Sequence, residues 1–205
     1  MGYNAPTSAA RTSTLVNYET LANEAEISAP TAKQWLSVLV SSGIVTLLEP
    51  YHNNVLKRVV KAPRMYFLDT GLAVHLMKWP NTVVLESGAM AGAFFETFVV
   101  SEIYKSFINM GKLPPLFYYR DSNTKEIDLI IQQGNTLYPI EIKKSGNPTG
   151  ATKHFSVLNP VADDKNFDEM SRQLKMEIGA GCVVCLANDL RPIDKKNWTV
   201  PVWLI

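Results

Sequence analysis

Charged side chains recur at alternating positions along two neighbouring segments that have the composition of β-strands. The first segment carries Glu126 and Asp128, and the second carries Glu141 and Lys143. The Gly-Asn pair at 134–135, between the segments, is typical of a two-residue hairpin loop. With this loop, Asp128 lies directly opposite Glu141, and Glu126 lies opposite Lys143. The pattern therefore predicts four charged side chains on one face of a hairpin.

Two carboxylates that face each other across a hairpin repel, and this weakens the pairing unless a cation lies between them. Asp128 and Glu141 supply the hard oxygen ligands that Mg²⁺ accepts together with water. Lys143 is placed to orient an attacking water or to neutralise charge on a phosphoryl group. Glu96, on a preceding predicted helix, is a candidate third metal ligand or general base. The sequence therefore predicts a Mg²⁺ site with Lys143 and Glu96 as candidate catalytic residues.

A solvated hairpin face is the alternative interpretation of the same residues. An exposed Glu126–Lys143 ion pair would contribute less than about 1 kcal/mol and would need no function. This alternative does not explain why Asp128 faces Glu141, and for that reason the predicted register favours the metal site.

The C-terminal part of the sequence, which we place at residues 93–205, has an α/β pattern around this hairpin. An amphipathic helix is expected first, followed by three strands, a second helix and two more strands. The predicted ranges are a helix at 93–107, strands at 116–120, 126–133 and 137–144, a helix at 168–178, and strands at 182–187 and 200–205.

The N-terminal part, residues 1–78, follows a different pattern, and residues 79–92 are the predicted linker. A short helix at 18–25 precedes a second helix at 31–42, which Ser28 caps and Gly43 ends. A strand at 44–48, a turn at 51–54 and a returning strand within 57–68 come next. Two helices followed by a β-ribbon predict a winged helix-turn-helix domain.

The ribbon of this domain carries the basic cluster of the N-terminal part: Lys57, Arg58, Lys61 and Arg64, with no acidic residue between them. Such a cluster is a candidate contact for nucleic-acid phosphates. The second helix offers one cation, Lys33, and many winged helices contact only proteins. The sequence leaves both interpretations open.

Overall composition excludes several classes of protein. The chain has 20 Lys and Arg against 19 Asp and Glu in 205 residues, which excludes a strongly basic coat protein. No apolar run approaches the roughly 20 residues needed to span a membrane, and no secretory signal is recognisable. The two cysteines, Cys182 and Cys185, lack a second pair or nearby histidines for zinc. We therefore expect no membrane contact, core cysteines and a reducing cytoplasm.

The candidate metal-binding and catalytic residues resemble the motif of the PD-(D/E)XK nuclease superfamily. Asp128, the Glu-Ile-Lys run at 141–143 and Glu96 lie at its motif positions. The wider sequence closely resembles a bacterial and archaeal family of predicted ATPases that carry a C-terminal domain of unknown function. The similar segments lie at 61–72, 95–102, 118–121 and 139–145, and the resemblance extends from Ala10 to Ile205.

Members of that family have an AAA-type P-loop ATPase first, then a winged helix and a nuclease-like fold. The resemblance therefore implies an α/β (α+β) chain in which the winged helix precedes a restriction-endonuclease-like mixed sheet flanked by helices. No G-x-x-x-x-G-K-[ST] motif occurs here, so ATP would enter only through an N-terminal domain outside this chain. In some nuclease relatives a Gln is followed four residues later by Tyr, whereas here Gln173 is followed by Glu177. The implied partners are the P-loop ATPase domain of a longer parent protein, and DNA.

Three hypotheses for the function of the chain follow from these residues, and the first two are the main ones. The chain is a DNA-processing module with a Mg²⁺-dependent phosphodiester-cleaving site, or it is a catalytically silent adaptor of the ATPase with the same fold. In the third, it binds DNA through the basic ribbon without cleavage. Asp69 is interpreted as a helix cap, and Asp121 as part of a strand-end turn.

Overall fold

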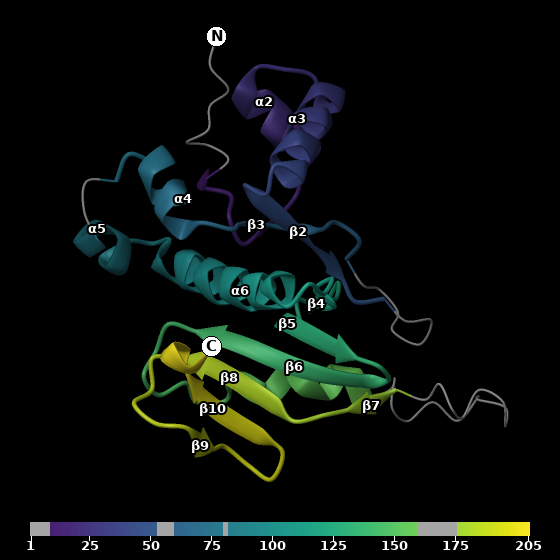
Figure 1. Ribbon diagram of the computed structural model, residues 1–205, viewed down its shortest axis with the longest axis vertical. Coiled ribbons are helices and arrows are strands. Elements are labelled where there is room, and N and C mark those ends of the chain that lie inside the picture. Colours follow the sequence, from purple (N-terminus) through teal and green to yellow (C-terminus); the bar gives the residue numbers. More distant parts are fainter. Residues whose placement is uncertain (1–8, 53–59, 80–81, 160–175) are drawn as a thin grey trace, which may run out of the picture. The chain divides into compact units, whose positions relative to one another are not determined.

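The computed structural model describes residues 9–52, 60–79, 82–159 and 176–205 (Figure 1). The chain divides into two compact units. Unit 1 comprises residues 1–48 and 62–110, and unit 2 comprises residues 49–61 and 111–205.

The two N-terminal helices of unit 1 begin at capping residues. Helix α2 (Tyr18–Ala25) is capped by Asn17, and helix α3 (Ala29–Ser41) is capped by Ser28, whose side chain accepts the expected backbone hydrogen bond. Gly43 follows α3 with a φ of +71°, a conformation that glycine adopts without a steric penalty. Both predicted helices are therefore confirmed.

A small antiparallel sheet follows these helices in unit 1. Its strand order is β1 (Thr14–Leu15), β3 (Arg64–Phe67) and the first four residues of β2 (Val45–Pro50). Asp69 then caps helix α4 (Thr70–Leu76), as its sequence position predicted.

Two further helices complete unit 1: α5 (Thr82–Ser87) and α6 (Ala91–Asn109). Phe94 of α6 packs with Trp79, and its side chain joins the apolar core formed by α2, α3 and the sheet. Helix α6 contains the predicted helix 93–107, and α5 lies within the predicted linker 79–92.

The centre of unit 2 is a mixed sheet. Strands β4, β5 and β6 pair antiparallel, β6 pairs parallel with β8, and β8 pairs parallel with β10. These strands lie side by side in Figure 1. Their bounds are β4 (Leu116–Arg120), β5 (Glu126–Gln133), β6 (Thr136–Lys143), β8 (Gly181–Cys185) and β10 (Asn197–Pro201).

Short elements complete unit 2. Strand β7 (Glu177–Ile178) pairs with β6, β9 (Arg191–Pro192) pairs with β10, and the end of β2 pairs with β4. The 3-10 helix η1 (Ala151–Leu158) packs against β5, β6 and β8, and a second, η3 (Val202–Leu204), follows β10. A side chain at Gly181 would collide with Phe155 of η1, so the glycine permits this close packing.

Helices combined with a sheet of parallel and antiparallel strands confirm the predicted α/β (α+β) class. Two predicted elements need correction. The last strand runs from Asn197 to Pro201, not 200–205, because Trp198 and Val200 pair with β8 and the chain then turns into η3. The predicted helix 168–178 falls largely outside the described residues, and its last two residues form β7.

The compact units and the predicted domain bounds divide the chain differently. The predicted second domain, 93–205, begins inside helix α6, whereas α6 belongs to unit 1. The bounds 1–78, 79–92 and 93–205 stay a prediction.

Candidate functional site

The pairing of β5 with β6 follows the predicted hairpin register. Leu129 pairs with Ile140, and the ladder continues in step to Gln133 and Thr136. Asp128 and Glu141 occupy the next position along each strand. Both residues are 6% exposed. The hairpin thus places two carboxylates together in the interior of unit 2.

Asp128 is fixed by the neighbouring strand and by a lysine. Its Oδ2 accepts a hydrogen bond of 2.8 Å from the backbone N–H of Ile142 and lies 3.3 Å from Lys143 Nζ. Lys143 Nζ also lies 2.7 Å from Glu141 Oε1. The ammonium group therefore bridges the two carboxylates. Although burial alone would lower the pKa of Lys143, the two adjacent carboxylates raise it above its usual value.

Glu141 retains one buried oxygen without a hydrogen-bond partner, Oε2. Burial, and next the charge of Asp128, raise the pKa of Glu141 to about 7, although Lys143 acts in the opposite direction. A buried carboxylate oxygen without a hydrogen-bond partner is uncommon and calls for an explanation.

A pocket of about 360 Å³ opens beside Glu141 and Lys143. Its volume falls in the range of small-molecule sites. The wall opposite the hairpin comes from the loop after β6 and from the start of η1. The remaining lining residues are Ser145, Pro148, Thr149, Gly150, Ala151, Lys153 and His154.

The sequence allows Lys153 as a phosphate contact but favours a solvated surface lysine, and it gives His154 no role, yet both residues line this pocket. His154 Nδ1 lies 3.2 Å from the carbonyl oxygen of Glu126, so η1 is tied to the first strand of the hairpin. A sequence signal for this helix start is Gly150, which has a φ of +65° and forms the N-cap of η1. In the sequence, a single lysine and a single histidine without the spacing of metal ligands do not indicate a binding site.

Glu96, predicted as a third ligand, lies in unit 1 and has partners there. Its Oε1 accepts a hydrogen bond of 2.6 Å from the Tyr66 hydroxyl and lies 3.2 Å from Arg64 Nη1. Burial, followed by the charge of Glu96, raises the pKa of Tyr66 well above its ordinary value. Within unit 1, Glu96 therefore acts as the counter-ion of a buried arginine, and its role as a metal ligand or base stays a prediction.

The predicted nucleic-acid contacts divide into three cases. Lys57 and Arg58 lie outside the described residues. Lys61 is exposed. Arg64 is only 5% exposed and forms the ion pair with Glu96, and its role as a nucleic-acid contact stays a prediction. The burial of Arg64 follows from its place at the start of β3, a strand whose four residues are all buried, and not on an exposed ribbon.

Asp128 and Glu141 suit a divalent cation by their chemistry. They are two hard oxygen ligands, and Glu141 Oε2 has no hydrogen-bond partner, but occupation of the pair by Mg²⁺ stays a prediction. Among the described residues, no group of three or more His, Cys, Asp or Glu is arranged to hold a metal. Mg²⁺ commonly keeps several waters and takes one or two carboxylates from the protein, so a two-carboxylate site is sufficient for it.

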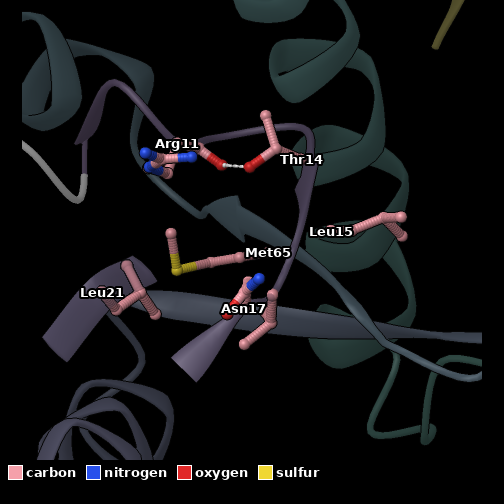
Figure 2. Close-up of a pocket in the computed structure, with 7 residues that line it drawn as sticks. Arg11, Thr14, Leu15, Asn17, Leu21 and Met65 are labelled. Atoms are coloured by element: carbon pink, nitrogen blue, oxygen red, sulfur yellow. Dashed lines mark hydrogen bonds between the residues drawn. The ribbon is translucent and has the colours of Figure 1, made fainter. Parts of the chain in front are cut away.

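Unit 1 contains a much smaller cavity, shown in Figure 2, between the segment 11–17, Leu21 and Met65. Its volume is about 10 Å³, close to the space of a single water molecule. The Thr14 hydroxyl donates a 2.7 Å hydrogen bond to the Arg11 carbonyl beside it. The size excludes a ligand, so the pocket in unit 2 is the better candidate site.

The raised pKa of Glu141 predicts a loss of stability with increasing pH. Since the folded pKa of about 7 exceeds the ordinary value of 4.5, the folded state binds more protons between these values. In metal-free buffer, raising the pH through this interval should lower the free energy of unfolding by up to about 3 kcal/mol. Urea denaturation at several pH values measures the effect.

Glu141→Gln is the matched control for this pH dependence, because glutamine is neutral throughout the interval. The difference in stability between the variant and the wild type should therefore change with pH in favour of the variant. Parallel pH profiles for the two proteins would contradict the assignment.

In the part of the chain that the structure describes, no helix is both long enough and apolar enough to cross a membrane.

Comparison with known proteins gives two family matches. Residues 7–83 match a family described as "Domain of unknown function (DUF8612)", and residues 91–205 match one described as "Domain of unknown function (DUF4143)". The latter match covers the hairpin, the pocket and helix α6.

Individual relatives are similar over part of the chain. The uncharacterized proteins Mb2031c of Mycobacterium bovis and Rv2008c of Mycobacterium tuberculosis are each 30% identical over 138 residues. The match covers 67% of this chain and 30% of each relative, so the chain spans about a third of their length.

A crystal structure of protein VC1899 from Vibrio cholerae is 15% identical and matches 94% of this chain and 43% of that protein. Its TM-score of 0.24 is too low to support an argument on the fold. The match over residues 91–205 includes more than half of the sequence, and the chain therefore belongs to the DUF4143 family, a domain of unknown function.

Proposed function

We propose that unit 2 is a Mg²⁺-dependent phosphodiester-cleaving module. The observation that carries the proposal is the buried Asp128–Glu141 pair, bridged by Lys143 and left with one unpartnered oxygen beside a pocket. The resemblance of Asp128 and the 141–143 run to the PD-(D/E)XK motif supports the same activity.

The residues of the site would divide the chemistry between them. Asp128 and Glu141 would hold the cation, and Ile142 N–H fixes the orientation of Asp128 through its 2.8 Å hydrogen bond. A bound Mg²⁺ supplies Lewis-acid stabilisation of charge on the phosphoryl group. Lys143 lines the pocket and carries a positive charge, so it would orient a water molecule and stabilise developing negative charge on a phosphoryl oxygen.

A silent adaptor is the second candidate function, and exposed apolar side chains of unit 2 favour it. Trp198, Trp203 and Leu204 are 41%, 58% and 59% exposed. Large exposed apolar side chains favour a contact with another protein when they gather in one patch. In this alternative the carboxylate pair binds no metal, and the surface contacts the ATPase domain of a longer parent protein.

Calorimetric titration with Mn²⁺ separates the two functions. The nuclease proposal predicts that the wild-type chain binds one Mn²⁺ and that Glu141→Gln weakens this binding by at least about tenfold, since one of two charged ligands is lost. Lys196→Ala, which changes an exposed residue outside the site, should bind as the wild type does. Absence of Mn²⁺ binding to the wild type would favour the adaptor.

The wider setting of the module is also part of the proposal. The resemblance to predicted ATPases with this C-terminal arrangement supports a P-loop ATPase domain as the partner. The two free cysteines support a reducing, cytoplasmic setting. DNA is the proposed substrate, and a winged helix in unit 1 is the proposed auxiliary module.

A further inference from the structure

Several residues with donor side chains line the pocket beside Glu141: Lys143, Lys153, Ser145 and Thr149. Glu141 is the one carboxylate residue among its lining residues, and it is paired with Lys143. Lys153 is exposed and forms no ion pair among the described residues. Charged and neutral donor side chains are the groups that bind an oxyanion such as phosphate.

The backbone of the same wall also favours an anion. Gly150 turns the chain into η1, whose first backbone N–H groups lack acceptors within the helix and carry partial positive charge. Glu141 lines the same pocket, and its buried Oε2 accepts no hydrogen bond. A cation held by Glu141 would be a complementary neighbour of an anion at η1.

The loop that joins β6 to η1 is held in place from the C-terminal strands. Arg191 Nη2 donates to the Gly146 carbonyl at 3.2 Å and to Asn147 Oδ1 at 3.3 Å. The Leu186 N–H donates to the Ser145 carbonyl at 3.0 Å. These contacts make the wall a built feature of unit 2, positioned before any ligand binds.

We propose that this pocket is a phosphate subsite for a nucleic-acid strand, with Lys153 as its charged contact and the start of η1 as its backbone contact. The proposal rests on the proposed function, because it places a phosphate of the substrate next to the Glu141–Lys143 pair. Lys153 would thus be a binding residue that positions the strand, and it would take no part in the chemistry.

Fluorescence anisotropy in EDTA tests this subsite without the metal. The probes are a labelled single-stranded oligonucleotide with a 5′-phosphate, the same strand without it, and the duplex. Lys153→Ala should weaken binding about fivefold or more. The slope of log K against log salt should become shallower by about 0.7 for the single strand or 0.9 for the duplex.

Lys196→Ala is the matched control. Lys196 is an exposed lysine of unit 2, next to β10, and it does not line the pocket. Its replacement removes the same charge and should leave affinity and salt slope close to those of the wild type. If Lys153→Ala weakens the binding of both single strands, the subsite binds an internal phosphodiester. If it weakens only the binding of the strand with the 5′-phosphate, the subsite binds a terminal phosphate. Equal effects of the two alanine variants would overturn the subsite.

Binding and cleavage measured on the same variants separate the phosphate subsite from the nuclease site. A Lys153-specific loss of binding in a chain that cleaves nothing retains the phosphate subsite and removes the nuclease proposal. Cleavage that depends on Asp128 but has the same KM in Lys153→Ala and in the wild type retains the nuclease and removes the subsite.

Discussion

Metal-dependent cleavage of a labelled oligonucleotide is expected to fall below detection when Asp128 is replaced by asparagine. The substitution keeps the size of the side chain but removes one of two charged oxygen ligands, and a neutral amide oxygen holds Mg²⁺ much less tightly. Lys143→Met is expected to lower kcat by about 10² to 10³-fold, because it removes one preorganised positive charge at the reacting phosphoryl group.

The two variants should differ in metal binding. Asp128→Asn should lose Mn²⁺ affinity, whereas Lys143→Met should retain it, since the lysine is a counter-charge to the carboxylates and not a ligand. Circular dichroism and urea denaturation check that each variant folds. Glu177→Gln is the matched control: it neutralises a carboxylate on β7 outside the pocket and should cleave at the wild-type rate. Cleavage at the wild-type rate by both site variants would exclude this site.

Glu96→Ala is expected to destabilise unit 1 by about 3 kcal/mol or more, because removing one partner of a buried ion pair leaves the other charge poorly compensated. Arg64 is only 5% exposed, and the Glu96 carboxylate accepts from both Arg64 and the fully buried Tyr66. Urea denaturation measures the loss.

Two further variants define what Glu96 does. Glu102→Ala, on the same helix, removes an exposed i,i+3 pair with Lys105 and should change stability by less than about 0.5 kcal/mol. Glu96→Gln keeps an acceptor for Tyr66 and should lose less stability than Glu96→Ala. Normal cleavage by a folded Glu96→Gln protein would show that Glu96 only stabilises the fold. Loss of cleavage would support its predicted role as a metal ligand or base. Equal stability of Glu96→Ala and Glu102→Ala would contradict the buried ion pair.

The hairpin and its carboxylates could be predicted because the information is local. A two-residue loop fixes the register of the strands on both sides, and register fixes which side chains face each other. The caps Ser28 and Asp69 were predictable for the same reason, since a capping side chain bonds to a backbone N–H three residues later.

Contacts between distant parts of the chain gave no such signal. Arg64 and Glu96 are 32 residues apart, and the sequence does not indicate that a basic residue of the ribbon meets an acid of α6. The pocket also depends on a distant contact, because η1 packs on β8 only where Gly181 leaves room for Phe155. From the sequence, Lys153 therefore remained one surface lysine among others that could contact phosphate, and its place beside Glu141 could not be predicted.

Cleavage of a phosphodiester bond by the wild-type chain, with Mg²⁺ supplied and then removed, tests the proposed nuclease site most directly. The measurement is the time course of cleavage of end-labelled single-stranded and duplex oligonucleotides in Mg²⁺, with EDTA added partway, and with Asp128→Asn in parallel. We expect fragments to accumulate in Mg²⁺, to stop accumulating after EDTA, and to be absent with Asp128→Asn. Intact substrates throughout the Mg²⁺ phase, or fragments that accumulate equally with Asp128→Asn, would contradict the proposed nuclease site.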